Sequence, residues 1–209
     1  MMTLPLPLPE HPLRCLHLGD SYTVAEGIPA DSGWPQVLRR RLETRSIGFT
    51  ETRLLASTGW TAGELLEALR EESLEPGWDL ITLCIGVNNQ YRGEDPASFS
   101  LELDQLIHEA RPLLRQPTDG LLLLSIPDWS ESPFAHGRDR AAIAAGIDSF
   151  NAVARMVAGR TGIPFIDWTG LTRRYGNRPE AFAGDGLHPS AAQYADWAAF
   201  LDGALFDGD

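Results

Sequence analysis

The stretch DLITLCI, residues 79–85, is apolar at successive positions as well as at alternate ones. A strand with this pattern is buried on both faces, as the inner strands of a parallel sheet are. GLLLLSI, residues 120–126, has the same character and predicts a second inner strand. Short runs bounded by turn residues predict three more strands, at residues 14–18, 50–57 and 164–168.

Amphipathic segments separate these strands. Apolar positions recur with helical spacing over residues 34–45, 61–73, 98–114, 139–159 and 191–205. Pro35 stands where a first-turn proline is tolerated, and Thr61 with Glu64 has the spacing of a capping box. Because strands alternate with helices, we expect an α/β fold of the flavodoxin-like kind, a three-layer α/β/α sandwich around a five-stranded parallel sheet.

The length of 209 residues suits one sizeable domain, which we place at residues 14–209 after a proline- and leucine-rich lead at residues 1–13. The lead has neither the basic head nor the unbroken apolar run of a secretory signal. Apolar stretches elsewhere are the length of strands, too short to span a bilayer. Cys15 and Cys84 fall within predicted strands and are expected to be packing residues. We therefore expect a cytoplasmic protein.

The charge of the chain excludes some classes of partner. The formal net charge is -12, and all 17 basic residues are arginine. Such a surface repels nucleic-acid backbones and anionic lipid, so we expect neither a nucleic-acid nor a membrane partner. The oligomeric state is left open by the sequence.

Gly19-Asp20-Ser21 directly follows the first predicted strand. In an open parallel sheet, ligands bind at the carboxyl ends of the strands, so a serine here can direct its hydroxyl into the binding crevice. The segment is not a G-x-S-x-G elbow, which disfavours an α/β-hydrolase. Taken alone, a serine at such a turn is usually a turn former or a helix cap, and Asp20 is expected to hold the turn.

Asp185 and His188 stand three residues apart in DGLHPS, residues 185–190. A serine hydroxyl needs a base to become a nucleophile, and histidine is suited to that role when a carboxylate fixes its other ring nitrogen. Two alternatives remain at this point. The segment could begin a helix, with Pro189 in its first turn, or the pair could be metal ligands, although no convincing third ligand is evident.

Two further loops offer hydrogen-bond donors. Gly59 follows the second strand and Asn88 follows the third. With the backbone N–H of Ser21, the Gly59 N–H and the Asn88 side-chain amide would place three donors around one oxyanion, and such donors contribute about 3–4 kcal/mol each to transition-state stabilisation. Individually, a turn glycine and a turn asparagine explain these residues as well.

The order of these motifs along the chain favours the catalytic interpretation over turns and helix caps. Serine, glycine, asparagine and the D-x-x-H pair each follow a strand, and together they resemble the four motif blocks of the SGNH (GDSL-type) hydrolase family over nearly the whole chain. The resemblance implies a serine esterase that needs no metal or cofactor. In it Ser21 is the nucleophile, His188 the base and Asp185 its orienting carboxylate, while Ser21, Gly59 and Asn88 form the oxyanion hole.

The chain departs from the family pattern at one position. The third block commonly reads G-x-N-D, and here Asn89 stands in place of the aspartate. The donor Asn88 is unchanged, so the departure affects only the hydrogen bonds that support its loop, since an amide can donate where a carboxylate only accepts.

Residues near the predicted site are candidates for substrate contact. They are Tyr22, Tyr91, Trp129 and Phe134, the last two on a long loop at residues 127–138 that could form one wall of the pocket. Because no lid domain is inserted, we expect a shallow pocket for short-chain acyl esters, such as acetyl esters of sugars or other small alcohols. Lysophospholipase or thioesterase, acyltransferase, and a catalytically silent ligand-binding domain remain as alternatives.

Overall fold

The computed structural model describes residues 10–116, 120–176 and 178–206. Most of the predicted lead, at residues 1–9, lies outside them. Five parallel strands form one sheet in the order β2-β1-β3-β4-β5. The predicted fold class is therefore confirmed. The strands are β1 (Leu13–Gly19), β2 (Phe49–Ala56), β3 (Leu80–Cys84), β4 (Leu121–Leu124) and β5 (Phe165–Ile166).

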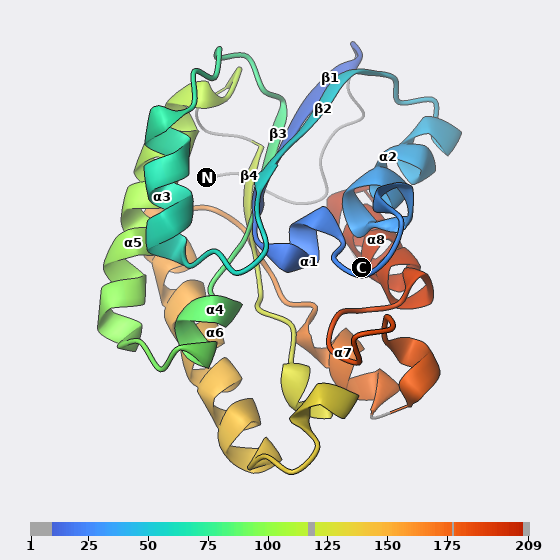
Figure 1. Cartoon of the computed structure of the whole chain (residues 1–209). Helices are drawn as coiled ribbons and strands as arrows, with labels where there is room; N and C mark the ends of the chain where they lie inside the picture. Colours follow the sequence, from blue (N-terminus) through green and yellow to red (C-terminus); the bar gives the residue numbers. More distant parts are fainter. Residues whose placement is uncertain (1–9, 117–119, 177, 207–209) are drawn as a thin grey trace.

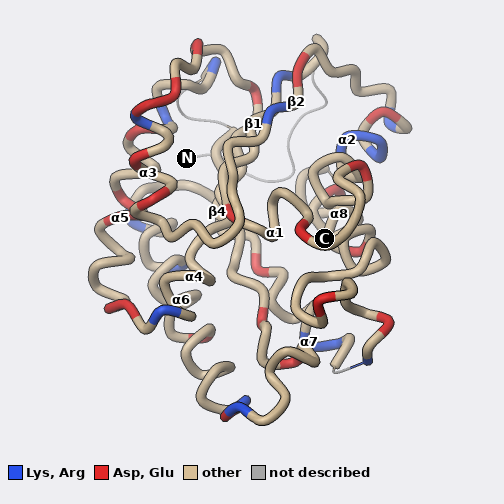
Figure 2. Tube along the Cα trace, in the orientation of Figure 1, with Lys and Arg blue, Asp and Glu red and all other residues tan. Residues whose placement is uncertain are grey.

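Helices cover both faces of the sheet (Figure 1). One layer contains α3 (Ala62–Glu71), α5 (Pro96–Ala110) and α6 (Arg140–Thr161), and the other contains α2 (Trp34–Thr44) and α8 (Ala191–Phe206). Acidic positions are spread over the helices of both layers (Figure 2). Three short helices that the periodicity did not predict lie after strand ends: α1 (Ser21–Val24), α4 (Val87–Tyr91) and α7 (Thr169–Tyr175).

Local chemistry explains where the predicted helices begin and end. Thr61 and Glu64 form the predicted capping box at the start of α3. The helix predicted at residues 98–114 begins earlier, at Pro96, because Asp95 caps it. It ends at Ala110 and continues as a 3-10 turn, Arg111–Leu113, since Pro112 has no N–H to donate to the preceding turn.

The core fills the space on both sides of the sheet. On the α2 and α8 side, the fully buried rings of Trp34, Trp168 and Trp197 pack edge-on and tilted, with centroids 5.4 Å and 4.8 Å apart. On the other side, α6 is long and apolar enough by length and composition to cross a membrane. Its inner face, which includes Ile147 and Phe150, is nevertheless buried in the domain, as in a core helix of a globular fold.

Burial predicts a large difference between two leucines of the described fold. Leu83, in β3, has no exposed surface, whereas Leu101 on α5 is 64% exposed. Leu83→Ala should lower the free energy of unfolding by about 2–5 kcal/mol, through lost burial and the cavity left behind. Leu101→Ala, the matched control, should change it by less than about 0.5 kcal/mol. Chemical denaturation measures both, and equal losses would contradict this account of the core.

Candidate functional site

The turn after β1 depends on close packing. A Cβ on Gly19 would lie 2.6 Å from the carbonyl oxygen of Cys84, so only glycine lets β1 end this close to β3. Asp20 is buried, and its side chain caps α1 by accepting a hydrogen bond from the Tyr22 N–H at 3.0 Å. Burial raises the pKa of Asp20 to about 7. Ser21, the predicted nucleophile, is therefore the first residue of a short capped helix, and Asp20 holds the turn as expected.

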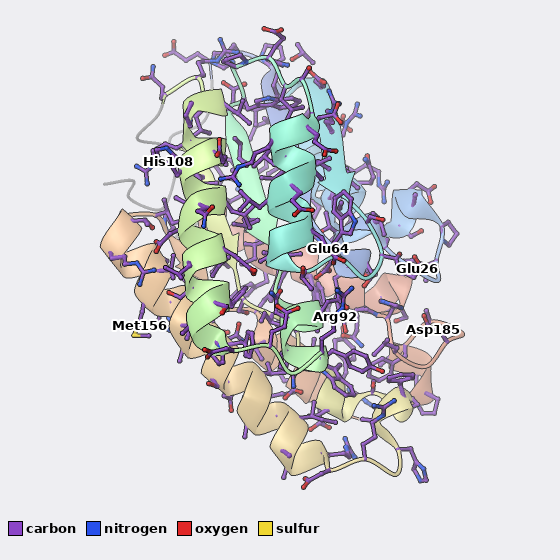
Figure 3. The ribbon with its side chains drawn as sticks, turned by 60° about the vertical axis from the view of Figure 1, so that its left-hand side comes forward. Glu26, Glu64, Arg92, His108, Met156 and Asp185 are labelled. Carbon is purple, nitrogen blue, oxygen red and sulfur yellow. The ribbon has the colours of Figure 1, made fainter. Side chains whose placement is uncertain are left out.

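The loop after β2, which contains Gly59, is held in place by Arg92 and Glu64. Gly59 has a φ of +83°, and a Cβ there would meet no atom within 4 Å, so its surroundings are open. The Gly59 carbonyl accepts a hydrogen bond from Arg92 Nη2 at 2.7 Å, and Arg92 Nη1 donates to Glu64 at 3.2 Å. The other oxygen of Glu64 accepts from the Thr61 N–H at 2.7 Å. Arg92 and Glu64 lie next to one another in Figure 3 and so tie the Gly59 loop to the start of α3.

The loop after β3 brings Asn88 to the same place. Gly86, with a φ of +120°, packs so closely that a Cβ would lie 2.6 Å from the Phe99 ring. The Asn88 amide nitrogen donates to the Trp60 carbonyl at 2.9 Å, which fixes the side chain beside the Gly59 loop. A primary amide carries two N–H donors, so one remains for a ligand.

Asn89 explains how the departure from the family pattern is accommodated. Its side chain is fully buried; its oxygen accepts from the Ala62 N–H at 2.9 Å. Its nitrogen donates to Glu94 at 2.7 Å and to Glu102 at 3.0 Å. An aspartate could accept from Ala62 but could donate to neither glutamate, so asparagine is the residue that suits these neighbours.

His188 and Asp185 form a close pair. Asp185 Oδ2 lies 2.6 Å from His188 Nδ1, and Asp185 Oδ1 accepts from the N–H groups of Leu187 at 2.8 Å and of His188 at 3.0 Å. Burial acts to raise the pKa of Asp185, but these hydrogen bonds together hold it below its usual value. The carboxylate is thus fixed in its charged form beside the ring, and the other ring nitrogen is left for a proton donor or acceptor in the pocket.

The sequence left two other interpretations of the 185–190 segment open, a helix start and a pair of metal ligands. The helix does not begin at Pro189: α8 begins at Ala191, and Pro189 forms an isolated bridge with Phe182. Among residues 10–116, 120–176 and 178–206, no cluster of three histidine, cysteine or carboxylate side chains is arranged to hold a metal ion.

One pocket of about 200 Å³ collects the predicted site residues. Asp185 stands behind it, bonded to His188. Thr58, Val87 and Leu187 also line the pocket; each adjoins a predicted residue in the sequence, which is the only signal that could have found them. The predicted residues in its wall are Ser21, Tyr22, Gly59, Asn88, Tyr91, Trp129, Phe134 and His188.

Tyr22 packs against different rings from the other predicted substrate-contacting residues, Tyr91, Trp129 and Phe134. It is 3% exposed and packs between the rings of Trp197, at 6.0 Å, and His188, at 5.4 Å, so it joins the histidine to the tryptophan core. Trp129 and Phe134 lie on two 3-10 turns of the 127–138 loop. The Phe134 N–H donates to the Gly186 carbonyl at 2.9 Å, which attaches this loop to the histidine segment.

Two other histidines lie away from the site. His17 is buried in β1, with Nδ1 2.8 Å from the Thr82 hydroxyl, and burial lowers its pKa to about 3. His108 lies on α5, far from Asp185 (Figure 3).

Asn89→Asp tests the bridge that the Asn89 side-chain amide forms by donating to both Glu94 and Glu102. Burial and then the charge of Glu94 raise the pKa of Glu102, so the folded state already disfavours a second charge here. A third carboxylate should destabilise the protein by roughly 1–3 kcal/mol at neutral pH. The deficit relative to wild type should shrink as the pH falls and the carboxyls become protonated. Denaturation at pH 7 and pH 5 measures this, and adding Glu102→Gln should restore part of the loss; a deficit that grows in acid would refute the account.

Comparisons with known proteins agree with this architecture. The family model for the GDSL-like lipase/acylhydrolase family matches residues 17–195. No curated protein matches the chain significantly.

Solved structures share the fold at low sequence identity. The lipase/acylhydrolase from Enterococcus faecalis superposes with a TM-score of 0.73 and 22% identity, covering 91% of this chain and 93% of that one. For TesA the values are 0.70 and 22%, with 90% and 95% covered. For the acetylxylan esterase Axe2 from Geobacillus stearothermophilus they are 0.68 and 20%, with 90% and 92% covered. Given the match of the family model to most of its length, the chain belongs to the GDSL-like lipase/acylhydrolase family and is a carboxylic ester hydrolase.

Proposed function

We propose that the protein is a serine esterase that removes short acyl groups, such as acetyl, from sugars or other small alcohols. The observation that carries the proposal is that Ser21, Gly59, Asn88 and His188 line one pocket while Asp185 holds the far side of the His188 ring. A hydroxyl, a base oriented by a carboxylate and a set of N–H donors are the groups that acyl transfer requires.

In the first step, His188 takes the hydroxyl proton of Ser21 as its Oγ bonds to the ester carbonyl carbon. The carbonyl oxygen becomes an oxyanion held by the N–H groups of Ser21 and Gly59 and by the free N–H of the Asn88 amide. The bond to the alcohol oxygen then breaks, and His188 gives its proton to the leaving alcohol. In the second step a water molecule, deprotonated by His188, attacks the acyl carbon. The bond from that carbon to Ser21 Oγ breaks, the acid leaves, and His188 returns the proton to Ser21 Oγ.

The size of the pocket supports a short acyl group. Cavities that enclose drug-sized ligands measure about 300–1,000 Å³, and this one is smaller, at about 200 Å³. A series of p-nitrophenyl esters from acetate to laurate tests the preference. Activity that rises toward the long chains would favour the lysophospholipase or thioesterase alternative, and transfer of the acyl group to an added alcohol would favour an acyltransferase.

Ser21→Ala should abolish turnover of p-nitrophenyl acetate, because the change removes the proposed nucleophile. Ser149, an exposed serine of α6, offers a matched control, and Ser149→Ala should keep full activity. A fluorophosphonate probe should label the wild type and the control at Ser21, as located by peptide mass spectrometry. Unlabelled wild-type protein would support the silent ligand-binding alternative, and labelling of Ser21→Ala would show that another nucleophile acts.

Arg92→Met should lower kcat by about tenfold with little change in KM. The change removes the hydrogen bond to the Gly59 carbonyl, so the Gly59 N–H is held less firmly where the oxyanion forms, and such an interaction acts mainly in the transition state. Steady-state kinetics separates the two constants.

Arg115 is the matched control for Arg92. It likewise donates to a carboxylate, Asp79, at 2.6 Å and to a glycine carbonyl, Gly77, at 3.3 Å, but at the opposite end of β3. Arg115→Met should leave kcat unchanged. Equal losses of kcat in the two variants, or a loss confined to KM in Arg92→Met, would contradict a positioning role for Arg92.

A further inference from the structure

A second hollow of about 500 Å³ opens beside the pocket that contains Ser21. Tyr91 and Trp129 line both cavities, so a ligand can extend from one to the other across their rings. The second hollow is also lined by Gln90, Arg138 and Asp139, which give it a more polar wall than the first. Its remaining wall is formed by Ala142 and Ile143 at the start of α6.

The rings between the two cavities form one cluster, which we call the aromatic cluster: Tyr91, Trp129 and Phe134. The centroid of Trp129 lies 5.5 Å from that of Tyr91 and 6.1 Å from that of Phe134. The indole N–H of Trp129 donates to the Gln90 side chain at 2.8 Å, which fixes the orientation of the ring. Tyr91 and Phe134 are exposed, so the cluster presents aromatic surface to a ligand without any rearrangement.

Arg138 lies over this cluster. Its guanidinium carbon is 4.6 Å from the centroid of Phe134 and 5.7 Å from the centroids of Tyr91 and Trp129. Stacking of this kind holds a guanidinium in place and leaves its N–H edges free to donate.

The charge of Arg138 is not neutralised by an ion pair. Arg140, two residues on, pairs with Glu131 at 2.9 Å, but within the part of the chain that the structure describes Arg138 forms no ion pair. Asp139 shares the hollow, but one of its carboxylate oxygens is occupied in capping α6 through the Ala142 N–H at 3.0 Å. In a protein of net charge -12, this is an exposed cation fixed beside the site.

The aromatic cluster adjoins the histidine side of the site. The Phe134 N–H bonds to the carbonyl of Gly186, two residues before His188. In the proposed reaction the leaving alcohol must reach the His188 ring to receive its proton, so the alcohol half of the ester lies on this side. A substituent on that alcohol would pass over the aromatic cluster toward Arg138.

We propose that the second hollow is a subsite for a carboxylate carried by the alcohol half of the ester, bound by the Arg138 guanidinium. The inference rests on the proposed function and specifies its substrate class: acyl esters of small hydroxy acids. A planar carboxylate matches the two-pronged donor geometry of a guanidinium, and the rings accommodate the body of the alcohol.

The test compares two acetyl esters, 4-carboxyphenyl acetate and its neutral counterpart, 4-(methoxycarbonyl)phenyl acetate. The quantity measured in each enzyme is kcat/KM for the carboxyphenyl ester divided by kcat/KM for the neutral ester. Comparing this ratio between enzymes cancels the different intrinsic reactivities of the two esters. Arg138→Gln should lower the ratio by about tenfold, which is the effect of losing one charge-assisted hydrogen bond at a partly exposed site. Arg40→Gln, an equal charge change at an exposed position of α2, should leave the ratio unchanged. Added salt should weaken the preference in the wild type.

A second pair of esters locates the anion. Mono-p-nitrophenyl succinate and p-nitrophenyl butyrate differ by a carboxylate in the acyl half. If Arg138→Gln changes the ratio for this pair and not for the carboxyphenyl pair, the subsite receives the acyl half and the proposal is wrong. The proposal also fails if Arg138→Gln and Arg40→Gln change the first ratio equally.

The affinity for 4-hydroxybenzoate, the alcohol released from 4-carboxyphenyl acetate, tests the subsite without catalysis. Quenching of tryptophan fluorescence should give a Kd about tenfold weaker in Arg138→Gln than in the wild type. Weaker binding in Arg138→Gln together with no turnover of any ester would overturn the esterase proposal and leave a carboxylate site. Hydrolysis of the neutral esters together with equal binding in the two proteins would overturn the subsite alone.

Discussion

The register in which β1 pairs with β3 determines where the site can form. Gly19 stands opposite Cys84, and the absence of a side chain on Gly19 lets the two strands end side by side. The chain leaving β1 turns at once into α1, and the chain leaving β3 turns into α4, so Ser21 and Asn88 emerge at the same edge. Because β2 lies on one side of β1 and β3 on the other, this edge is also the point where the strand order reverses, which is where open parallel sheets bind ligands.

Much of the arrangement could be predicted from the sequence because it depends on short-range patterns. Apolar runs marked the inner strands, Thr61 with Glu64 marked the start of α3, and glycines marked the turns at strand ends. A parallel sheet then brings residues at its carboxyl edge together whatever their distance in the sequence. This is why the sequence predicts that Ser21, Gly59, Asn88 and His188 lie close together, as they do in one pocket.

The contacts that support the site could not be predicted in the same way. Arg92 reaches the Gly59 carbonyl 33 residues earlier, and the Phe134 N–H donates to the carbonyl of Gly186. Such pairs join elements that become neighbours only after the sheet has formed, and no periodicity records them. The same holds for the packing of Tyr22, which lines the pocket and also lies between the rings of His188 and Trp197.

The Asn89 bridge also constrains how the sequence can diverge. Its amide lies between two glutamates, so an aspartate at position 89 destabilises the fold unless position 94 or 102 loses its charge or gains a donor. We therefore expect positions 89, 94 and 102 to covary, although they are up to 13 residues apart. A lineage that changes from asparagine to aspartate at position 89 would change a glutamate first, because that order avoids an intermediate with three carboxylates facing one another.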